Sequence, residues 1–435
     1  MITAADMALR APVAVAPGPY AFTSGPPVSV PATNRERWVR MVLFVTMLLS
    51  GIAKIEPSPH DFMVLVMILV AFVAGIRFDR FAIPLFVLLL IWVSGVLMAL
   101  PNVLGNKEAF TYAATSIYLS LAAVLFACLF AQDTMERMAV VRTAYIAAAV
   151  VCALAGTAGY FHLGGSHVWF TLYDRADGFF KDPNVFGPFL IWPALILVSR
   201  MLLKRFRLRD LIPLGIIMIG LLLSLSRGAW MHFLASAVIM WLLLFLTARE
   251  DRTRVRMIGM TALGAFLVVA LFVALMSVSS FRTLFLERAN ALNGYDIGEN
   301  GRFEMQALAL QELLNYPFGM GPFEFALEHG LQQHNVYLQS FLVYGWAGGL
   351  SYIFLVLLTL LVGLRNALIA TPWQIYAVIA FAVFAGEAGE GMVIDSDHWR
   401  HFFLILGMVW GLAAATRHHR RKYAPGHPPM PAVVP

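Results

Sequence analysis

A series of long apolar runs occupies the chain from about residue 41 to residue 415. Most of them contain about 15 to 25 residues, which is enough for an α-helix to cross the hydrocarbon core of a bilayer, about 30 Å thick. The ten-residue alternation of apolar and polar positions that marks a membrane β-barrel is not seen. The runs therefore predict an all-α polytopic membrane bundle, and a hydrophobic content of 60% with only 13% charged residues excludes an ordinary soluble domain.

Polar breaks divide the runs into candidate membrane spans. The first, second and seventh spans are short, and only Ser226 and Arg227 separate the seventh from the eighth, so about twelve transmembrane helices are expected, within two. The candidate spans are residues 38–54, 61–76, 81–100, 110–131, 141–161, 184–203, 210–225, 228–247, 257–279, 336–363, 372–391 and 401–416.

Lys and Arg residues are distributed unevenly between the two sides that these spans create. The side holding both termini has 22 of the 31 basic residues, and the other side has 9. Because cytoplasmic loops carry an excess of Lys and Arg, both termini are predicted in the cytoplasm, with periplasmic loops at residues 163–183 and 280–335. The net charge of +6 is then a topology signal, and no nucleic-acid partner is expected.

Three regions follow along the chain. Residues 1–37, rich in Pro, Ala and Gly, predict a disordered cytoplasmic segment without the features of a cleaved signal peptide. Residues 38–416 form the transmembrane domain, and residues 417–435 a basic cytoplasmic tail. Cys128 and Cys152 fall in apolar spans without companion ligands, so they are interpreted as packing residues.

The periplasmic loop at residues 280–335 is the longest interval without an apolar run of membrane length. Apolar residues at helical spacing, beginning near residue 299, predict an amphipathic helix that lies at the membrane surface and caps the bundle. These residues are Phe303, Ala307, Leu310 and Leu314.

Two arginines on the predicted periplasmic side are not required by topology. Arg227 lies in a turn too short to be a solvated loop, so its guanidinium either reaches the membrane interface or faces a water-filled cavity, where its planar fork would suit a phosphate. Arg175 either forms a local salt bridge within residues 174–178 or converges with Arg227. The sequence Asp-Pro-Asn at residues 182–184 predicts a turn and a helix N-cap.

His334 and Asn335 end the long loop where the next apolar run begins. The imidazole of His334 either hydrogen-bonds a neighbouring loop, or acts as a general acid or base or contacts a phosphate, since an imidazole titrates near neutral pH. Arg302 is expected to be solvated or paired with Glu299 or Glu304 rather than catalytic. No nucleotide fingerprint, P-loop, DxD-type motif or HExxH appears, so no cofactor or metal is expected and any energy must come with the substrate.

Several of these residues together resemble a known family. The hexapeptide LSRGAW at residues 225–230, then a long loop, then His334-Asn335, nine residues, Gly345, two residues and Gly348, resembles the O-antigen ligase and polymerase superfamily of bacterial envelope glycosyltransferases. The segment at residues 175–184 is also similar.

The resemblance implies a metal-independent enzyme of the bacterial inner membrane. It would act in the bilayer, at its periplasmic face, on an undecaprenyl-diphosphate-linked oligosaccharide, with a flippase and a chain-length regulator as partners. Arg175 and Arg227 would hold the donor diphosphate, and His334 would position or deprotonate the attacking sugar hydroxyl. Arg302 and Asn335 would be further substrate contacts.

Five functions are compatible with this pattern. The segment at residues 56–61 looks more like exopolysaccharide polymerases than ligases, so an enzyme that polymerises glycan repeat units is preferred. The alternatives within the superfamily are a ligase that joins the glycan to lipid A core and a protein O-oligosaccharyltransferase. From other classes, a polysaccharide or lipid transporter would explain Glu387 and Glu390 within an apolar run, and an assembly protein would tolerate loss of Arg227 and His334.

Overall fold

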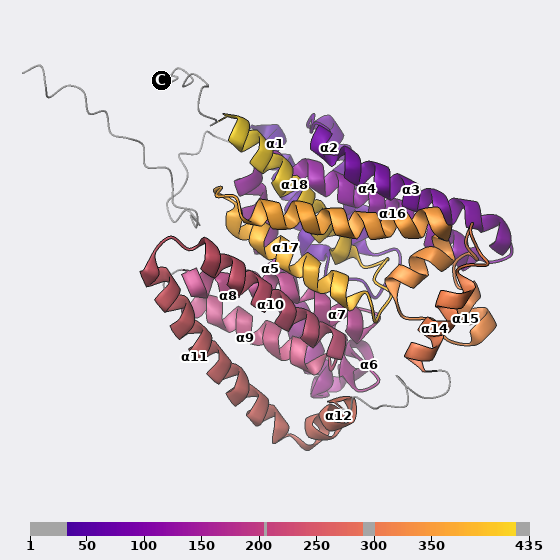
Figure 1. Cartoon of the computed structure of the whole chain (residues 1–435). Coiled ribbons are helices and arrows are strands. Elements are labelled where there is room, and N and C mark those ends of the chain that lie inside the picture. The colour runs from indigo at the N-terminus through magenta and orange to yellow at the C-terminus, as the bar shows by residue number, and fades with distance from the viewer. Residues whose placement is uncertain (1–32, 204–206, 290–300, 423–435) are drawn as a thin grey trace, which may run out of the picture.

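A computed structural model describes residues 33–203, 207–289 and 301–422 of the chain, and these form a bundle of helices (Figure 1). Within the described residues the one sheet has two short strands, in which β1 (Thr171–Leu172) pairs antiparallel with β2 (Arg175–Ala176). The predicted all-α membrane fold is confirmed. Most of the segment predicted to be disordered, residues 1–32, and the end of the tail, residues 423–435, lie outside the described residues.

A helix occupies each of the twelve candidate spans. These helices are α1 (Asn34–Leu49), α2 (Pro59–Val73), α3 (Ile83–Ala99), α4 (Lys107–Phe130), α5 (Thr134–Tyr160), α7 (Pro183–Phe189) with α8 (Ile191–Leu203), α9 (Leu208–Leu223), α10 (Arg227–Thr247), α11 (Asp251–Met276), α16 (Val336–Ala367), α17 (Gln374–Glu390) and α18 (Arg400–Lys422). The shorter helices between them are η1 (Arg80–Ala82), η2 (Leu100–Val103), η3 (Leu163–Gly165), α6 (His167–Phe170), α12 (Ser279–Ala289), α14 (Arg302–Glu312) and α15 (Glu324–His329).

Seven helices of the described part of the chain are long and apolar enough to cross a membrane. Of the other predicted spans, α1, α2, α9 and α17 contain 16, 15, 16 and 17 residues. Sixteen residues of α-helix extend for about 24 Å, which is less than a hydrocarbon core of about 30 Å. The α18 helix is longer, but its last turn is basic. Membrane crossing by these five helices stays a prediction.

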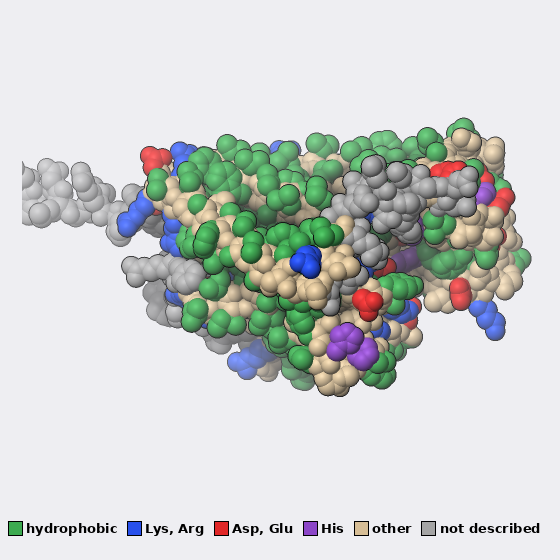
Figure 2. All heavy atoms as spheres, turned by 90° about the horizontal axis from the view of Figure 1, so that it is seen from below, with side chains coloured by type: hydrophobic (Ala, Val, Ile, Leu, Met, Phe, Trp, Pro, Cys, Tyr) green, Lys and Arg blue, Asp and Glu red, His purple; other side chains and the backbone are tan. Residues whose placement is uncertain are grey.

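The best-buried helices stand at the centre of the bundle. The α16 helix packs along α3, α18 packs along α4, and α10 packs along α17. In an 18-residue window of the span formed by α7 and α8, 83% of the residues are buried, compared with 6% in such a window of α11, which lies at the edge of the bundle in Figure 1. Hydrophobic side chains cover most of the face seen in Figure 2. Such an extensive exposed apolar surface is what a lipid-facing bundle requires.

Salt bridges between different segments of the chain group at the two ends of the bundle. At the end near both termini of the described chain they are Arg137–Glu36, Arg200–Asp210 and His418–Asp79, and at the other end they are Lys54–Asp177, Lys181–Glu56 and Arg400–Asp61. This grouping agrees with the two sides predicted from the spans. That the first end faces the cytoplasm stays a prediction, which rests on the distribution of Lys and Arg.

The α14 helix lies in the long loop, where an amphipathic helix was predicted, and it carries two apolar stripes. The predicted stripe, which includes Phe303 and Leu310, is exposed. A second stripe, Met305 and Ala309, is one turn apart and buried. It packs in a small apolar cluster that also contains Met320, Phe325 and Leu342. The second stripe thus docks α14 on the bundle, and contact of the first with the membrane surface stays a prediction.

Candidate functional site

A cavity of about 600 Å³ lies at the end of the bundle opposite the termini. Its wall is formed by the β1–β2 hairpin, the start of α7, and the turn between α9 and α10. The start of α14, His334, and the end of α17 with the loop that follows complete it. Four residues singled out in the sequence line this one cavity, although up to 159 positions separate them in the chain. They are Arg175, Arg227, Arg302 and His334.

Arg175 reaches the cavity because the β1–β2 hairpin turns tightly. Tyr173 and Asp174 both have left-handed φ angles, 51° and 55°, as in a two-residue hairpin turn of type I′. The buried side chain of Arg175 donates from Nε to the Ser224 carbonyl oxygen at 2.9 Å and from Nη2 to Asn184 Oδ1 at 2.8 Å. These two bonds hold the planar guanidinium in place on the cavity wall.

Arg227 is the first residue of α10, in the short turn that the sequence predicted. The turn is made by Leu225, whose φ is 47°, and by Ser226, whose Oγ accepts a hydrogen bond from the Ala229 N–H at 3.3 Å. The half-buried guanidinium of Arg227 therefore lies at the N-terminus of a helix of 21 residues. An anion in the cavity would meet both the cation and the positive end of the helix dipole.

His334 lines the cavity in a backbone conformation that is uncommon outside glycine, with a φ of 47°. Its Nδ1 lies 3.4 Å from Asp395 Oδ2, and Asp395 Oδ1 accepts a hydrogen bond from the Asn335 N–H at 2.9 Å. Burial raises the pKa of the Asp395 carboxyl, and the nearby Asp397 adds to this rise, while the contact with His334 opposes it. Asp395 can thus orient the imidazole.

Asn335 was predicted to contact substrate, but it is not among the described residues that line the cavity. Its Oδ1 accepts hydrogen bonds from the N–H groups of Tyr337 and Leu338 at 3.0 and 3.1 Å, which caps α16. Its Nδ2 donates to the Met392 carbonyl oxygen at 3.0 Å. Both ends of the amide therefore join α16 to the loop after α17, which supports a role in positioning the neighbouring His334.

Six of the nine cations on the predicted periplasmic side fall into two groups. Lys54, Lys181 and Arg400 form salt bridges with Asp177, Glu56 and Asp61, whereas Arg175, Arg227 and Arg302 line the cavity. The first group thus stabilises the fold, and it includes the contacts of residues 56–61, the segment that favoured a polymerase. Arg302 is half-buried at the start of α14, and its predicted partner Glu299 lies outside the described residues.

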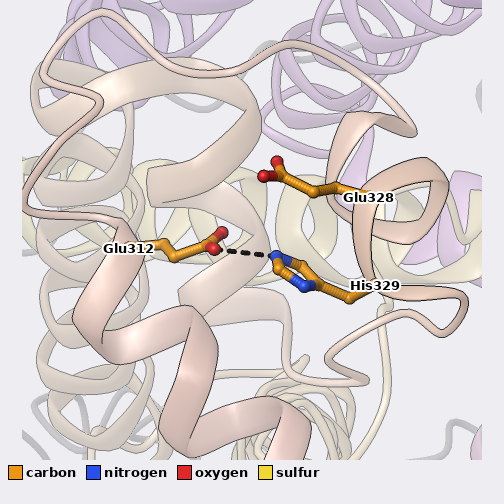
Figure 3. Close-up of side chains that lie close together, drawn as sticks. All are labelled: Glu312, Glu328 and His329. Atoms are coloured by element: carbon orange, nitrogen blue, oxygen red, sulfur yellow. Dashed lines mark hydrogen bonds and ion pairs between the residues drawn. The ribbon is translucent and has the colours of Figure 1, made fainter.

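One cluster of metal-ligand donors is found among the described residues, and it lies apart from the cavity. The ligand atoms of Glu312, Glu328 and His329, on α14 and α15, lie within 4.8 Å of one another (Figure 3). An imidazole with two carboxylates suits Zn²⁺ or Mn²⁺. However, His329 Nε2 already lies 2.7 Å from Glu312 Oε1. This hydrogen bond by itself explains the cluster as a contact between α14 and α15.

Three acidic residues line the cavity, namely Asp182, Glu390 and Asp395, and the sequence interpretation assigned none of them to it. Asp182 was interpreted as part of a turn and helix N-cap, Glu390 as support for a transporter, and Asp395 was not singled out. The available signal was an ionisable residue at the end of an apolar run, which marks a functional position in membrane proteins. The sequence could not indicate which helix end each carboxylate would face.

The fold and the cavity define a multi-pass membrane protein with a cavity at one end of its bundle that is lined by charged residues of both signs. A family model described as O-antigen ligase matches residues 212–353, from α9 to α16, and the match includes Arg227, Arg302 and His334. This match covers about a third of the chain and supports the resemblance to the O-antigen ligase and polymerase superfamily, whose members are glycosyltransferase-like membrane enzymes. No curated protein matches the chain.

Proposed function

We propose that the protein is a metal-independent glycosyltransferase of the bacterial inner membrane. It transfers an undecaprenyl-diphosphate-linked glycan on the periplasmic face and polymerises repeat units of a surface polysaccharide. The observation that carries this proposal is the convergence of three arginines and one histidine on a single cavity at one end of a membrane bundle. A donor of this kind reaches the periplasmic face through a flippase, and a chain-length regulator would act on the product.

The chemistry follows from the residues on the cavity wall. An acceptor hydroxyl attacks C1 of the donor sugar, the bond from C1 to the phosphate oxygen breaks, and the polyprenyl diphosphate leaves with one additional negative charge. Arg175 and Arg227 stabilise this charge, and His334, oriented by Asp395, takes the proton of the acceptor hydroxyl. Arg302 lies where it can contact the diphosphate or the glycan.

A polymerase and a ligase differ in the acceptor, so the test varies the acceptor. Purified protein is incubated with a synthetic polyprenyl-diphosphate oligosaccharide, without nucleotide or metal, and the products are separated on a gel. With no other acceptor, we expect a ladder of repeat units that is lost in Arg227→Ala and in His334→Ala. A ladder that persists in both variants would remove these residues from the reaction.

Other results would select the alternatives. Transfer of a single glycan, only after lipid A core is added, would identify a ligase, and transfer only to a protein would identify an O-oligosaccharyltransferase. If no acceptor supports transfer, the enzyme proposal fails, and movement of the lipid-linked glycan across reconstituted vesicles then tests the transporter.

A further inference from the structure

We propose that Glu390, held by His232, is the general acid that protonates the departing diphosphate. This inference rests on the proposed glycan transfer and adds a second proton-handling residue to it. Glu390 is the last residue of α17, 5% exposed, and its side chain lines the same cavity as His334 and the arginines. Burying an ionisable carboxyl costs free energy, so a buried carboxyl on the wall of a cavity in a membrane protein indicates a functional position.

The carboxyl of Glu390 presents one oxygen toward the cavity end of α10. Its Oε1 has no hydrogen-bond partner among the described residues. A Cβ atom placed on Gly228, which also lines the cavity, would lie 2.7 Å from this oxygen. Oε1 therefore lies beside the residue that follows Arg227, where the diphosphate is proposed to bind. Glycine at position 228 leaves room for this approach.

The other oxygen of Glu390 shares a proton with His232. His232 Nε2 lies 3.0 Å from the Val383 carbonyl oxygen, and a carbonyl only accepts, so Nε2 carries a proton. His232 Nδ1 lies 2.8 Å from Glu390 Oε2, and this contact also needs a proton between its two atoms. The pair is thus either a neutral glutamic acid with a neutral imidazole, or a carboxylate with an imidazolium. Both forms hold one proton that can be given away.

Close packing between α10 and α17 creates this pair. A Cβ atom at Gly386 would overlap both His232 and Ser236, so glycine is needed for α10 to approach closely enough. Ser236 Oγ donates to the Ala382 carbonyl oxygen at 2.9 Å on the same contact. One turn before Glu390, the fully buried Glu387 lies 3.4 Å from His401 Nε2. The pair is therefore held rigidly in surroundings that contain a second acid and a second imidazole.

With Glu390 as the acid, one proton is taken up and one is given during the transfer. His334 takes the proton of the acceptor hydroxyl as the new bond from C1 to oxygen forms. The bond from C1 to the phosphate oxygen breaks, and the proton held by Glu390 and His232 moves to that oxygen through Glu390. The diphosphate leaves with one fewer negative charge than it would otherwise carry, and proton exchange with solvent restores both pairs. Glu390 is the catalytic residue in this step, and His232 is a positioning residue.

The experiment compares two donors that differ in how much the leaving group needs a proton. In one donor a methylene group bridges the two phosphorus atoms, and in the other a difluoromethylene group of nearly the same shape makes the leaving oxygen less basic. Rates are measured for wild type, Glu390→Gln and the control Glu312→Gln, with the natural diphosphate as reference. Glu312 lies in the cluster of Figure 3, away from the cavity.

For Glu390→Gln we expect about a 100-fold loss of turnover with the natural and methylene donors, because general acids contribute at least about that factor. With the difluoromethylene donor the loss should be about tenfold smaller, and Glu312→Gln should match wild type with all donors. Equal losses of Glu390→Gln with both analogues, or no loss with the natural donor, would overturn the proposal. A merely structural residue would lower both rates alike.

A second variant, His232→Asn, keeps the proposal testable if Glu390→Gln does not fold. His232→Asn should also lower turnover and should also be rescued by the difluoromethylene donor, whereas a rate ratio equal to that of wild type would overturn the pairing. Failure of the proposed function looks different: wild type itself would then produce no transfer from the natural donor to any acceptor.

Discussion

The two ends of the bundle use arginine in different ways. At the end near the termini, the buried Arg137 donates to the Glu36 carboxylate at 2.8 Å. Burial alone would raise the pKa of Glu36, but the hydrogen bonds from Arg137 and Arg40 outweigh it and lower the pKa. At the cavity end, Arg175 is equally buried, but its described bonds go to a carbonyl and an amide oxygen.

This difference separates a stabilising cation from a binding cation. A guanidinium paired with a carboxylate is neutralised, and its removal leaves an uncompensated charge in the fold. A guanidinium on the cavity wall can stabilise an anion that arrives or develops in the cavity. Activity should therefore depend on the cavity arginines, and stability on those at the opposite end.

The largest expected effect is on activity. Arg227→Ala should lower glycan transfer by about 100- to 1,000-fold, the usual effect of removing one donor to a developing charge. Its thermal stability in detergent should remain close to that of wild type. The matched variant Arg137→Ala should do the opposite, with a loss of about 3 kcal/mol in the free energy of unfolding, because it removes the buried partner of Glu36 and leaves this partly buried carboxylate with only its more exposed partner Arg40. Equal stability losses in the two variants would contradict the comparison.

Local features of the sequence were enough to predict most of the fold. Apolar length predicted a helix at every candidate span, and the two-residue break at Ser226 and Arg227 predicted the turn that presents Arg227. The convergence of the site residues on one cavity could not be predicted in this way, because it depends on tertiary packing. Nothing local distinguishes Arg400, which pairs with Asp61, from Arg302, which lines the cavity.

The hydrogen-bond partners of the site residues could not be predicted from the sequence either. Asn335 follows a candidate catalytic histidine and looks like a substrate ligand in the sequence, yet both ends of its amide are used to cap and fasten α16. The partners of Glu390 and His334, namely His232 and Asp395, lie 158 and 61 positions away. Such pairs are fixed by how the helices pack, and a single sequence does not encode them as a motif.

A smaller expected effect is that Asp79 and Asp395 contribute to folding stability with opposite dependence on pH. At the end near the termini, burial would raise the pKa of Asp79, but the hydrogen bonds from His418 and the Phe81 N–H lower it below the usual value. At the cavity end, burial raises the pKa of Asp395. Asp79 therefore adds stability above the usual aspartate pKa and loses it as pH falls, whereas Asp395 favours the folded state when protonated and loses this contribution as pH rises through its raised pKa.

Melting temperatures of the Asn variants between pH 3 and 7 test these signs. The advantage of wild type over Asp79→Asn should shrink as pH falls, and the stability of wild type relative to Asp395→Asn should increase as pH falls. Glycan transfer by Asp395→Asn at pH 7 should drop about tenfold, less than the effect of losing a general base itself. Parallel pH curves for the two variants would refute the contrast between the ends.

The smallest expected effect concerns metal ions, and it tests whether the cavity needs a cation that is not an arginine. If Arg175 and Arg227 supply the positive charge for the diphosphate, a chelator should change glycan transfer by less than about twofold, because no Lewis acid then takes part in the step.

The cluster of Glu312, Glu328 and His329 is the described position where a bound ion could still act, by fastening α15 to α14. Chelation in Glu312→Gln, which weakens that cluster, serves as the control. A loss of activity that chelation causes in wild type but not in this variant would mean that an ion at the cluster holds α14, and with it Arg302, at the cavity. A loss in both would place a required metal in the cavity itself and would make the arginines secondary.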